Sequence, residues 1–221
     1  MENNKLNSFG MHIDEAFSAD FQQKLSELFS SISDGIEVQT SLVLETLEHL
    51  LPYLPCTDVA DIQSLKPLVE SAKAHRQEFE IGTIFHRWHL IPCLDEQYGV
   101  YLHRITDEDT RWPHDHPWDF ISLVIEGTYT EHIVVNQSEN GDLVYSTIAR
   151  AGEDGAAFRK AEHQHYTRVQ EGKEAWTVVF RQPVRRTWGF QTNQGWRAWN
   201  ESGHHDGELE LAGGLRPLID Q

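Results

Sequence analysis

The chain has 221 residues and a formal net charge of −17, which comes from 35 acidic and 18 basic side chains. This charge argues against nucleic acid as a partner, because a nucleic-acid binder needs Lys and Arg to displace counterions from phosphates, and it equally argues against an anionic membrane surface. Apolar residues make up 39% of the chain, which at this length supports one good-sized core with at most a small appended domain.

The N-terminus and the cysteines favour a cytoplasmic protein. The segment Met1–Lys5 is polar and lacks the apolar core of a signal peptide, and no run of eighteen apolar residues predicts a transmembrane helix. Cys56 and Cys93 lie too far apart in sequence to form a CxxC pair. We therefore expect two buried or free thiols in a reducing compartment.

Residues 1–78 are expected to form a small α-helical N-terminal region. Apolar side chains recur there at three- and four-residue steps, the spacing of an amphipathic helix, and the prolines at 52 and 55 cannot continue one. No catalytic grouping is recognisable, so we interpret the region as a packing element or as a docking surface for a protein or peptide. The expected helices cover Phe17–Ile32, then, after a break at Asp34-Gly35, Leu42–Leu51, and finally a stretch from Asp58 or Asp61 to Lys73.

Residues 79–200 are expected to form a mainly β domain. Short runs rich in β-branched and aromatic residues alternate there with turn signals, among them Glu126-Gly127 and Gly152–Gly155. About eight strands without intervening helices predict a sandwich or barrel, followed by an acidic, glycine-rich tail over 201–221 that we expect to be weakly ordered. The expected strands are Gly82–Trp88, Gly99–Ile105, Trp118–Ile125, Thr128–Val135, Leu143–Ile148, Ala156–Arg159, His165–Val169 and Ala175–Phe180.

The segment Pro113–Phe120, Pro-His-Asp-His-Pro-Trp-Asp-Phe, is the strongest functional signal. Side chains alternate along extended backbone, so His114 and His116 point to one side and Asp115 to the other. A third imidazole is available at His165. Neutral imidazole is a common nitrogen ligand for Fe, Zn, Ni, Cu and Mn, and the pattern therefore predicts a site for one divalent metal ion.

These features resemble the cupin superfamily of small double-stranded β-helix, or jelly-roll, barrels. The first cupin motif places HxH before a glutamate and a glycine; His114, His116 and Gly127 fit that frame, whereas the glutamate position falls on Phe120 or Ile121. The second motif places its histidine ten residues after a glycine, as His165 follows Gly155. A closer resemblance is to largely uncharacterised bacterial and phage cupin-like proteins that carry a segment similar to His114–Phe120, a late FRxAExxH histidine, and WGF and GW near the C-terminus, here Trp188–Phe190 and Gly195-Trp196.

Without the motif glutamate, the expected site is a face of three histidines. Such a face is similar to that of the thiol dioxygenases. This resemblance implies an Fe(II) ion that activates oxygen, and Zn, Ni or Mn are the alternative metals. A carboxylate from Glu126 or Glu131 is an alternative fourth ligand. His163 is an alternative to His165, because residues two apart on a strand share a face.

Further side chains are candidates for the pocket around the metal. Arg104 and Arg159 each offer a guanidinium that could hold a substrate carboxylate through two parallel hydrogen bonds. The aromatic candidates for the pocket wall are Trp118, Phe120 and Trp188. Tyr129 and Tyr166 carry hydroxyls that could serve as acid or base, so the candidate catalytic set is Arg104, Tyr129 and Tyr166.

The sequence therefore favours a three-histidine Fe(II) oxygenase acting on a small carboxylate-bearing amino acid or thiol. Two alternatives remain open: a Zn, Ni or Mn cupin isomerase or hydrolase, and a non-catalytic barrel that binds a ligand or a partner protein. A homodimer is expected from the cupin resemblance alone.

Overall fold

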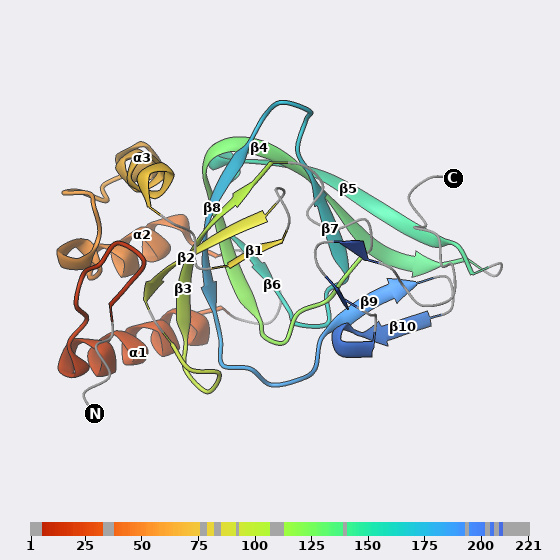
Figure 1. Cartoon of the computed structure of the whole chain (residues 1–221), viewed down its shortest axis with the longest axis horizontal. Coiled ribbons are helices and arrows are strands. Elements are labelled where there is room, and N and C mark those ends of the chain that lie inside the picture. Colours follow the sequence, from red (N-terminus) through yellow and green to blue (C-terminus); the bar gives the residue numbers. More distant parts are fainter. Residues whose placement is uncertain are drawn as a thin grey trace.

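Three helices cover one side of an antiparallel β barrel in the computed structural model (Figure 1). The described residues are 6–32, 38–75, 79–81, 85–91, 93–106, 113–138, 141–192, 195–201, 204–205 and 208–209. The expected Asp34-Gly35 break, the polar start at Met1–Lys5 and most of the expected tail lie outside them. The mainly β, jelly-roll class with a small helical N-terminal region is confirmed.

The helical region follows the apolar periodicity closely. Helix α1 spans Glu15–Ser30 and begins where the Asp14 carboxylate accepts a hydrogen bond from the backbone N–H of Phe17 (2.7 Å). Helix α2 spans Thr40–Glu48, and α3 spans Lys66–Ala74. Two 3-10 turns, η1 over Leu51–Tyr53 and η2 over Ile62–Leu65, take up the proline-containing connection and the start of the third expected helix.

The strands form one sheet of order β1-β2-β3-β8-β4-β5, with β6 and β7 also paired to β4, and a separate β9–β10 hairpin. The hairpin was not predicted, because each of its strands has only four residues and carries polar side chains. The bounds are β1 Phe79–Ile81, β2 Phe85–Ile91, β3 Gly99–Ile105, β4 Phe120–Gln137, β5 Leu143–Ala151, β6 Ala157–Arg159, β7 His165–Arg168, β8 Ala175–Arg181, β9 Gly189–Thr192, β10 Gly195–Ala198, β11 His204–His205 and β12 Glu208–Leu209, with 3-10 turns η3 Gly152–Asp154 and η4 Trp199–Glu201.

Strand β4 corrects one expectation. The predicted turn at Glu126-Gly127 does not exist; the two predicted strands are a single strand of 18 residues with a bulge between Val124 and Glu126. Gly127 has φ +74°, and a Cβ there would lie 2.1 Å from the carbonyl oxygen of Glu174, so the position requires glycine. β4 pairs with β6 before the bulge and with β8 as far as Gly127, just past it. From Thr128 onward it pairs with β5 and then β7, so this one strand curves from one wall of the barrel into the other.

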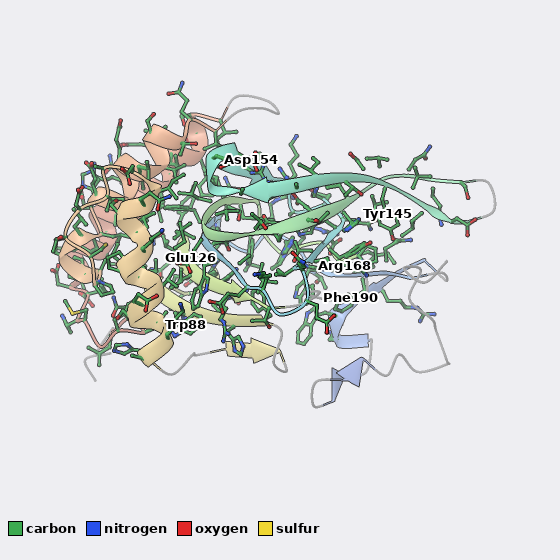
Figure 2. All side chains as sticks on the ribbon, turned by 90° about the horizontal axis from the view of Figure 1, so that it is seen from above. Trp88, Glu126, Tyr145, Asp154, Arg168 and Phe190 are labelled. Carbon is green, nitrogen blue, oxygen red and sulfur yellow. The ribbon has the colours of Figure 1, made fainter. Side chains whose placement is uncertain are left out.

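The main apolar core lies between the helices and the outer face of the barrel. Leu102 of β3 and Trp176 of β8 belong to the same buried cluster as Leu25 of α1 and Leu68 of α3. Figure 2 shows Trp88 of β2 beside the helical layer, where its indole N–H donates to the carbonyl of His75 (3.3 Å). Helices and barrel therefore share one core, and the division into 1–78 and 79–200 as separate parts stays a prediction.

No helix in the described part of the chain is long and apolar enough to cross a membrane.

Candidate metal centre

The backbone of the Pro-His-Asp-His segment is held between β7 and β9. His114 and His165 exchange two backbone hydrogen bonds, N–H of each to the carbonyl of the other (2.9 and 3.0 Å), and His114 also bridges to Phe190. The N–H of His116 donates to the carbonyl of Ala161 (2.9 Å). These bonds keep the segment extended, so that His114 and His116 share one side.

The three predicted imidazoles converge. Their ring centroids form a nearly equilateral triangle with sides of 4.9 Å (His114–His116), 5.1 Å (His116–His165) and 5.2 Å (His114–His165). All three offer a ring nitrogen within 4.8 Å of the other two. The Nε2 atoms of His116 and His165 are 2.9 Å apart, close to the separation of about 3 Å expected for neighbouring nitrogens on one ion at about 2.1 Å. The donor set therefore fits a single divalent ion.

Burial keeps the imidazole of His116 neutral. Desolvation lowers the pKa of His116 well below its ordinary value, and the neighbouring His114 and His165 lower it further. A neutral imidazole is the form that binds metal ions.

Glu131 contacts His165 from the side opposite the triangle. The Nδ1–H of His165 donates to Oε1 of Glu131 (2.7 Å), because a carboxylate can only accept. Arg159 donates through Nε to Oε1 (2.9 Å) and through Nη2 to Oε2. Burial raises the pKa of Glu131, but the hydrogen bonds from His165 and Arg159 outweigh it and hold that pKa far below the usual range. Both carboxylate oxygens are thus engaged outside the triangle.

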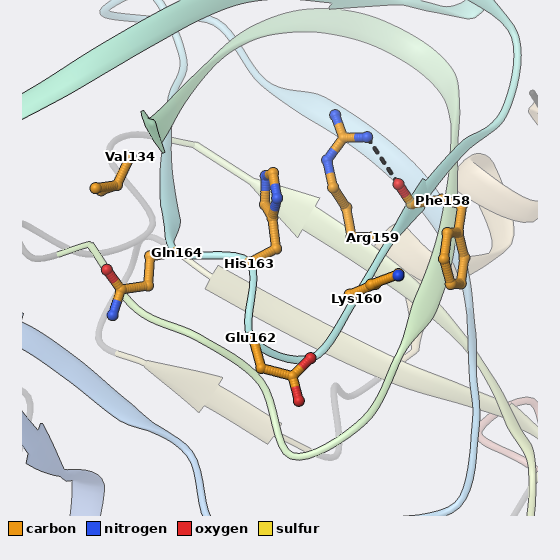
Figure 3. A pocket seen from close by; sticks show the side chains of 7 residues that line it. All are labelled: Val134, Phe158, Arg159, Lys160, Glu162, His163 and Gln164. Carbon is orange, nitrogen blue, oxygen red and sulfur yellow. Dashed lines mark hydrogen bonds between the residues drawn. The ribbon is translucent and has the colours of Figure 1, made fainter. Parts of the chain in front are cut away.

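The alternative ligands do not join the triangle. His163 forms a second group with Glu131 and His165, in which its Nε2 lies 4.0 Å from Oε1 of Glu131. It faces a cavity of about 460 Å³ whose wall also includes Arg159 (Figure 3). Burial, with the charges of His165 and Arg159, lowers the pKa of His163 to about 4. Glu126 pairs in register with Trp176, whose side chain belongs to the core on the helix side.

Aromatic side chains from the predicted wall surround the imidazoles. Trp118 stacks on His116 with ring centroids 5.2 Å apart, and Phe120 meets the same ring edge-on at 4.7 Å. Trp188 lies 6.3 Å from His114. All three predicted aromatic residues therefore lie against the histidine triangle.

The predicted catalytic set is dispersed by the fold. Arg104 pairs in register with Trp176 on the helix side and binds Glu174 through Nε–Oε2 (2.7 Å). Tyr166 stacks on His132 (4.4 Å, 4°), because it alternates with His165 and points to the opposite face. Tyr129 is buried inside the barrel in an apolar cluster, where burial and the charge of Glu131 raise its pKa to about 12. None of these three is brought into contact with the histidine triangle by a described interaction.

Two arginines on the inner face of the barrel were missed from the sequence. Arg87 of β2 donates through Nε to Nε2 of His103 (2.9 Å) and lies over the ring of Tyr101 (4.6 Å). Arg181 donates to the hydroxyl of Tyr101 (2.8 Å) and to Sγ of Cys93 (3.0 Å). Strand alternation was the available signal, since Tyr101 and His103 share a face from which Leu102 points away.

Asp115, between the two ligands, was expected only to point away from them. Its carboxylate accepts from the backbone N–H of Gly189 (2.7 Å), from Nε1 of Trp196 (2.9 Å) and from Nη1 of Arg186 (2.7 Å). These bonds attach the β9–β10 hairpin to the segment that carries His114 and His116. The sequence carried no signal for this, because the partners lie more than seventy positions further along.

The chain resembles known proteins in structure, at low sequence identity. No protein-family model and no curated protein matches the chain. Among solved structures, vicilin from hazelnut (Corylus avellana) is 12% identical, over 50% of this chain and 33% of that chain, with a TM-score of 0.39. The DMSP lyase DddQ from Ruegeria pomeroyi is 10% identical, over 82% of this chain and 100% of that chain, with a TM-score of 0.43. Oxalate oxidase in complex with the substrate analogue glycolate is 20% identical, over 42% and 45% respectively, with a TM-score of 0.32.

These three proteins have the cupin fold. The matched part spans about a third of the length of the vicilins. All three TM-scores are below 0.5, so no residue role and no activity is transferred from these proteins to this chain.

Proposed function

We propose that the chain is a metal-dependent oxygenase in which His114, His116 and His165 hold one divalent ion, with Fe(II) favoured over Zn, Ni or Mn. The observation that carries the proposal is the convergence of three imidazoles, with no carboxylate in the triangle among the described residues. A ferrous ion bound by such a face keeps open positions and supplies the capacity to activate dioxygen. The thiol dioxygenases, which the site resembles, combine these same features.

The charge of the site favours an anionic substrate. Uncharged ligands leave the charge of a divalent ion uncompensated in the triangle, and Glu131 is neutralised by Arg159. A small thiol or amino acid with a carboxylate supplies the missing negative charge.

Arg87 is our choice for the group that binds the substrate carboxylate, in place of Arg104 and Arg159. It lies on the inner face of the barrel, and its positive charge contributes to the lowered pKa of His116. Tyr101, on which its guanidinium packs, belongs to the same buried cluster as Trp118 and Phe120. An apolar wall thus connects the ligand imidazole to the arginine. We expect Arg87→Met to raise KM about tenfold or more with a smaller change in kcat, because a charge-assisted hydrogen bond to the substrate is lost.

The aromatic wall has a second role in the proposal. Trp118 and Phe120 are buried and pack directly on His116. They exclude water from one side of the ion, which protects a reactive thiolate and strengthens electrostatic attraction to the bound carboxylate.

The reaction we propose for a thiol is R–SH + O₂ → R–SO₂H. The sulfur is oxidised, dioxygen is reduced, both oxygen atoms enter the product and no outside reductant is needed. The test is anaerobic purification, metal analysis, and measurement of oxygen uptake with small carboxylate-bearing thiols and amino acids. We expect one equivalent of iron per chain and one O₂ consumed per product, with both atoms labelled from ¹⁸O₂.

The matched variants are His116→Ala and His132→Ala. His132 stacks on Tyr166 outside the triangle, so its loss removes an imidazole without touching the proposed ligands. We expect only His116→Ala to abolish metal binding and oxygen uptake. Folded wild-type protein that binds no metal, or bound metal that never consumes oxygen with any of these substrates, would contradict the proposal. The second result would favour a Lewis-acid or a non-catalytic role instead.

The expected homodimer and the docking role of the helices stay predictions. Sedimentation at several protein concentrations tests the first. Binding to a partner that survives His116→Ala would favour the second.

A further inference from the structure

Glu131 reaches His165 because of the pairing of β4 with β7. Ile133 stands opposite His165, so Glu131, two residues earlier, shares its face as a diagonal neighbour. Only 2% of Glu131 is exposed, and its Oε1 accepts from Nδ1–H of His165 (2.7 Å). On the other side of the same ring, Nε2 points into the triangle, 2.9 Å from Nε2 of His116. One ring nitrogen of His165 therefore contacts the Glu131 carboxylate, and the other faces the histidine triangle.

We propose that Glu131 and Arg159 form a positioning pair that fixes His165 with its proton on Nδ1, and so keeps Nε2 free to bind the metal ion. The tautomer part of this inference stands on the described contacts alone. The consequence for metal binding rests on the proposed function.

The chemistry of the pair explains why two residues are needed. A carboxylate has no proton to donate, so whichever oxygen faces Nδ1 must accept from it. Arg159 has only donors, and its Nη1 is also held by the carbonyl of Phe158 (2.9 Å). Arg159 thus holds Glu131 in one orientation in a buried place, where a neutral imidazole on its own would be free to carry its proton on either nitrogen.

The variant Glu131→Leu turns this reasoning into a test. It removes the oxygen that accepts both from Nδ1–H of His165 and from Nε of Arg159, and Arg159 has only donors. Nδ1–H then loses its acceptor and faces the donors of Arg159, so the ring is expected to accept at Nδ1 and to carry its proton on Nε2, where the metal ion would bind. We expect the tautomer to invert and the affinity for Co²⁺ to fall by roughly 10- to 100-fold, the range typical of lost partners behind a metal ligand.

The double variant Glu131→Leu/Arg159→Met separates positioning from simple loss of a buried ion pair. Without the guanidinium, its donors no longer face Nδ1, so the ring is no longer driven to the tautomer with its proton on Nε2. We expect the double variant to bind Co²⁺ more tightly than Glu131→Leu alone, although it carries one more substitution. In Arg159→Met alone the carboxylate still accepts from Nδ1, so the tautomer is retained.

The measurements are the ¹⁵N and ¹H signals of the His165 ring in metal-free protein, and titration with Co²⁺ followed by its visible absorption. Glu126→Leu is the matched control, because it makes the same chemical change on the same strand, on the side facing Trp176. If Glu131→Leu does not fold, Arg159→Met and the double variant still report the tautomer.

The possible failures are distinguishable. Wild-type protein with the Nδ1–H tautomer but no affinity for Co²⁺ would overturn the proposed metal site and leave the tautomer assignment standing. Glu131→Leu that keeps the Nδ1–H tautomer and wild-type affinity would overturn the positioning pair and leave the metal site standing.

Discussion

The two faces of the sheet formed by β2, β3, β8 and the first half of β4 carry opposite chemistry. The face toward the helices is apolar throughout its centre, whereas the face toward the inside of the barrel carries buried polar groups. On the outer side lie Trp88, Leu90, Val100, Leu102, Ile121, Leu123, Trp176, Val178 and Phe180, and on the inner side His103, Ser122, Thr177 and Arg181. The chain thus places its main apolar core outside the barrel, whereas the interior combines two smaller apolar clusters with buried polar groups.

This arrangement explains the role of the helices in physical terms. The hydrogen-bonded imidazoles, carboxylates and guanidinium groups inside the barrel gain little from burial, since polar groups must first replace their bonds to water. The helices supply the missing apolar contact area from outside. Along each of these strands, the residues that pack against the helices therefore alternate with the residues that face the candidate site.

The largest expected effect comes from the outer face. Leu102 is fully buried between β3 and the helices, so Leu102→Ala should lower the free energy of unfolding by about 2–5 kcal/mol through lost burial and a residual cavity. Urea denaturation measures the change. Val144→Ala, on the exposed face of β5, should stay within about 0.5 kcal/mol. Comparable losses from both would mean that the apolar layer is not where stability resides.

An intermediate effect is expected from the inner face at alkaline pH. Burial and the charge of Glu131 raise the pKa of Tyr129 from 10.0 to about 12. The folded state therefore keeps a proton that the unfolded state releases, so this contribution is complete below pH about 10 and is lost as pH rises toward 12. Two pKa units correspond to about 3 kcal/mol at most. Tyr129→Phe should make the decline in stability between pH 9 and 11.5 shallower; an unchanged slope would indicate a hydrated interior.

The smallest effect is expected from Arg104→Ala. The Arg104–Glu174 ion pair is partly exposed, so its loss should cost less than about 1 kcal/mol and leave Co²⁺ affinity and oxygen uptake unchanged. Thermal unfolding and the activity assay measure both quantities. A large loss of activity from this variant, and none from Arg87→Met, would place the substrate on the other side of the sheet.

Much of the fold could be predicted from the sequence because its signals are local. Apolar spacing located α1, and the expected strand over Gly99–Ile105 coincides with β3. The predicted turn at Glu126-Gly127 was wrong because a glycine with positive φ occurs in a β-bulge as readily as in a turn. For Arg104 the signal was present: it alternates in step with Val100 and Leu102, which placed it on the apolar face.

The candidate site was predictable only in part, for a different reason. The spacing of His114 and His116 suffices to put them on one side of an extended segment. The contact between Glu131 and His165 depends on which residues of β4 and β7 stand opposite one another, and a shift of one position would turn Glu131 away. The bonds of Asp115 depend on a hairpin that follows it by more than seventy residues.

The pairing of His114 with His165 has a consequence for how the protein folds. Between these two residues the chain must first complete β4, β5 and β6, so the backbone bridge that joins them closes a long loop. A contact between residues so far apart in sequence costs much chain entropy to form. We therefore expect it to form late in folding, after the local β4–β5 hairpin. Metal uptake during refolding should therefore follow the recovery of β-sheet circular dichroism, and stopped-flow absorption of Co²⁺ would serve as a clock for barrel closure.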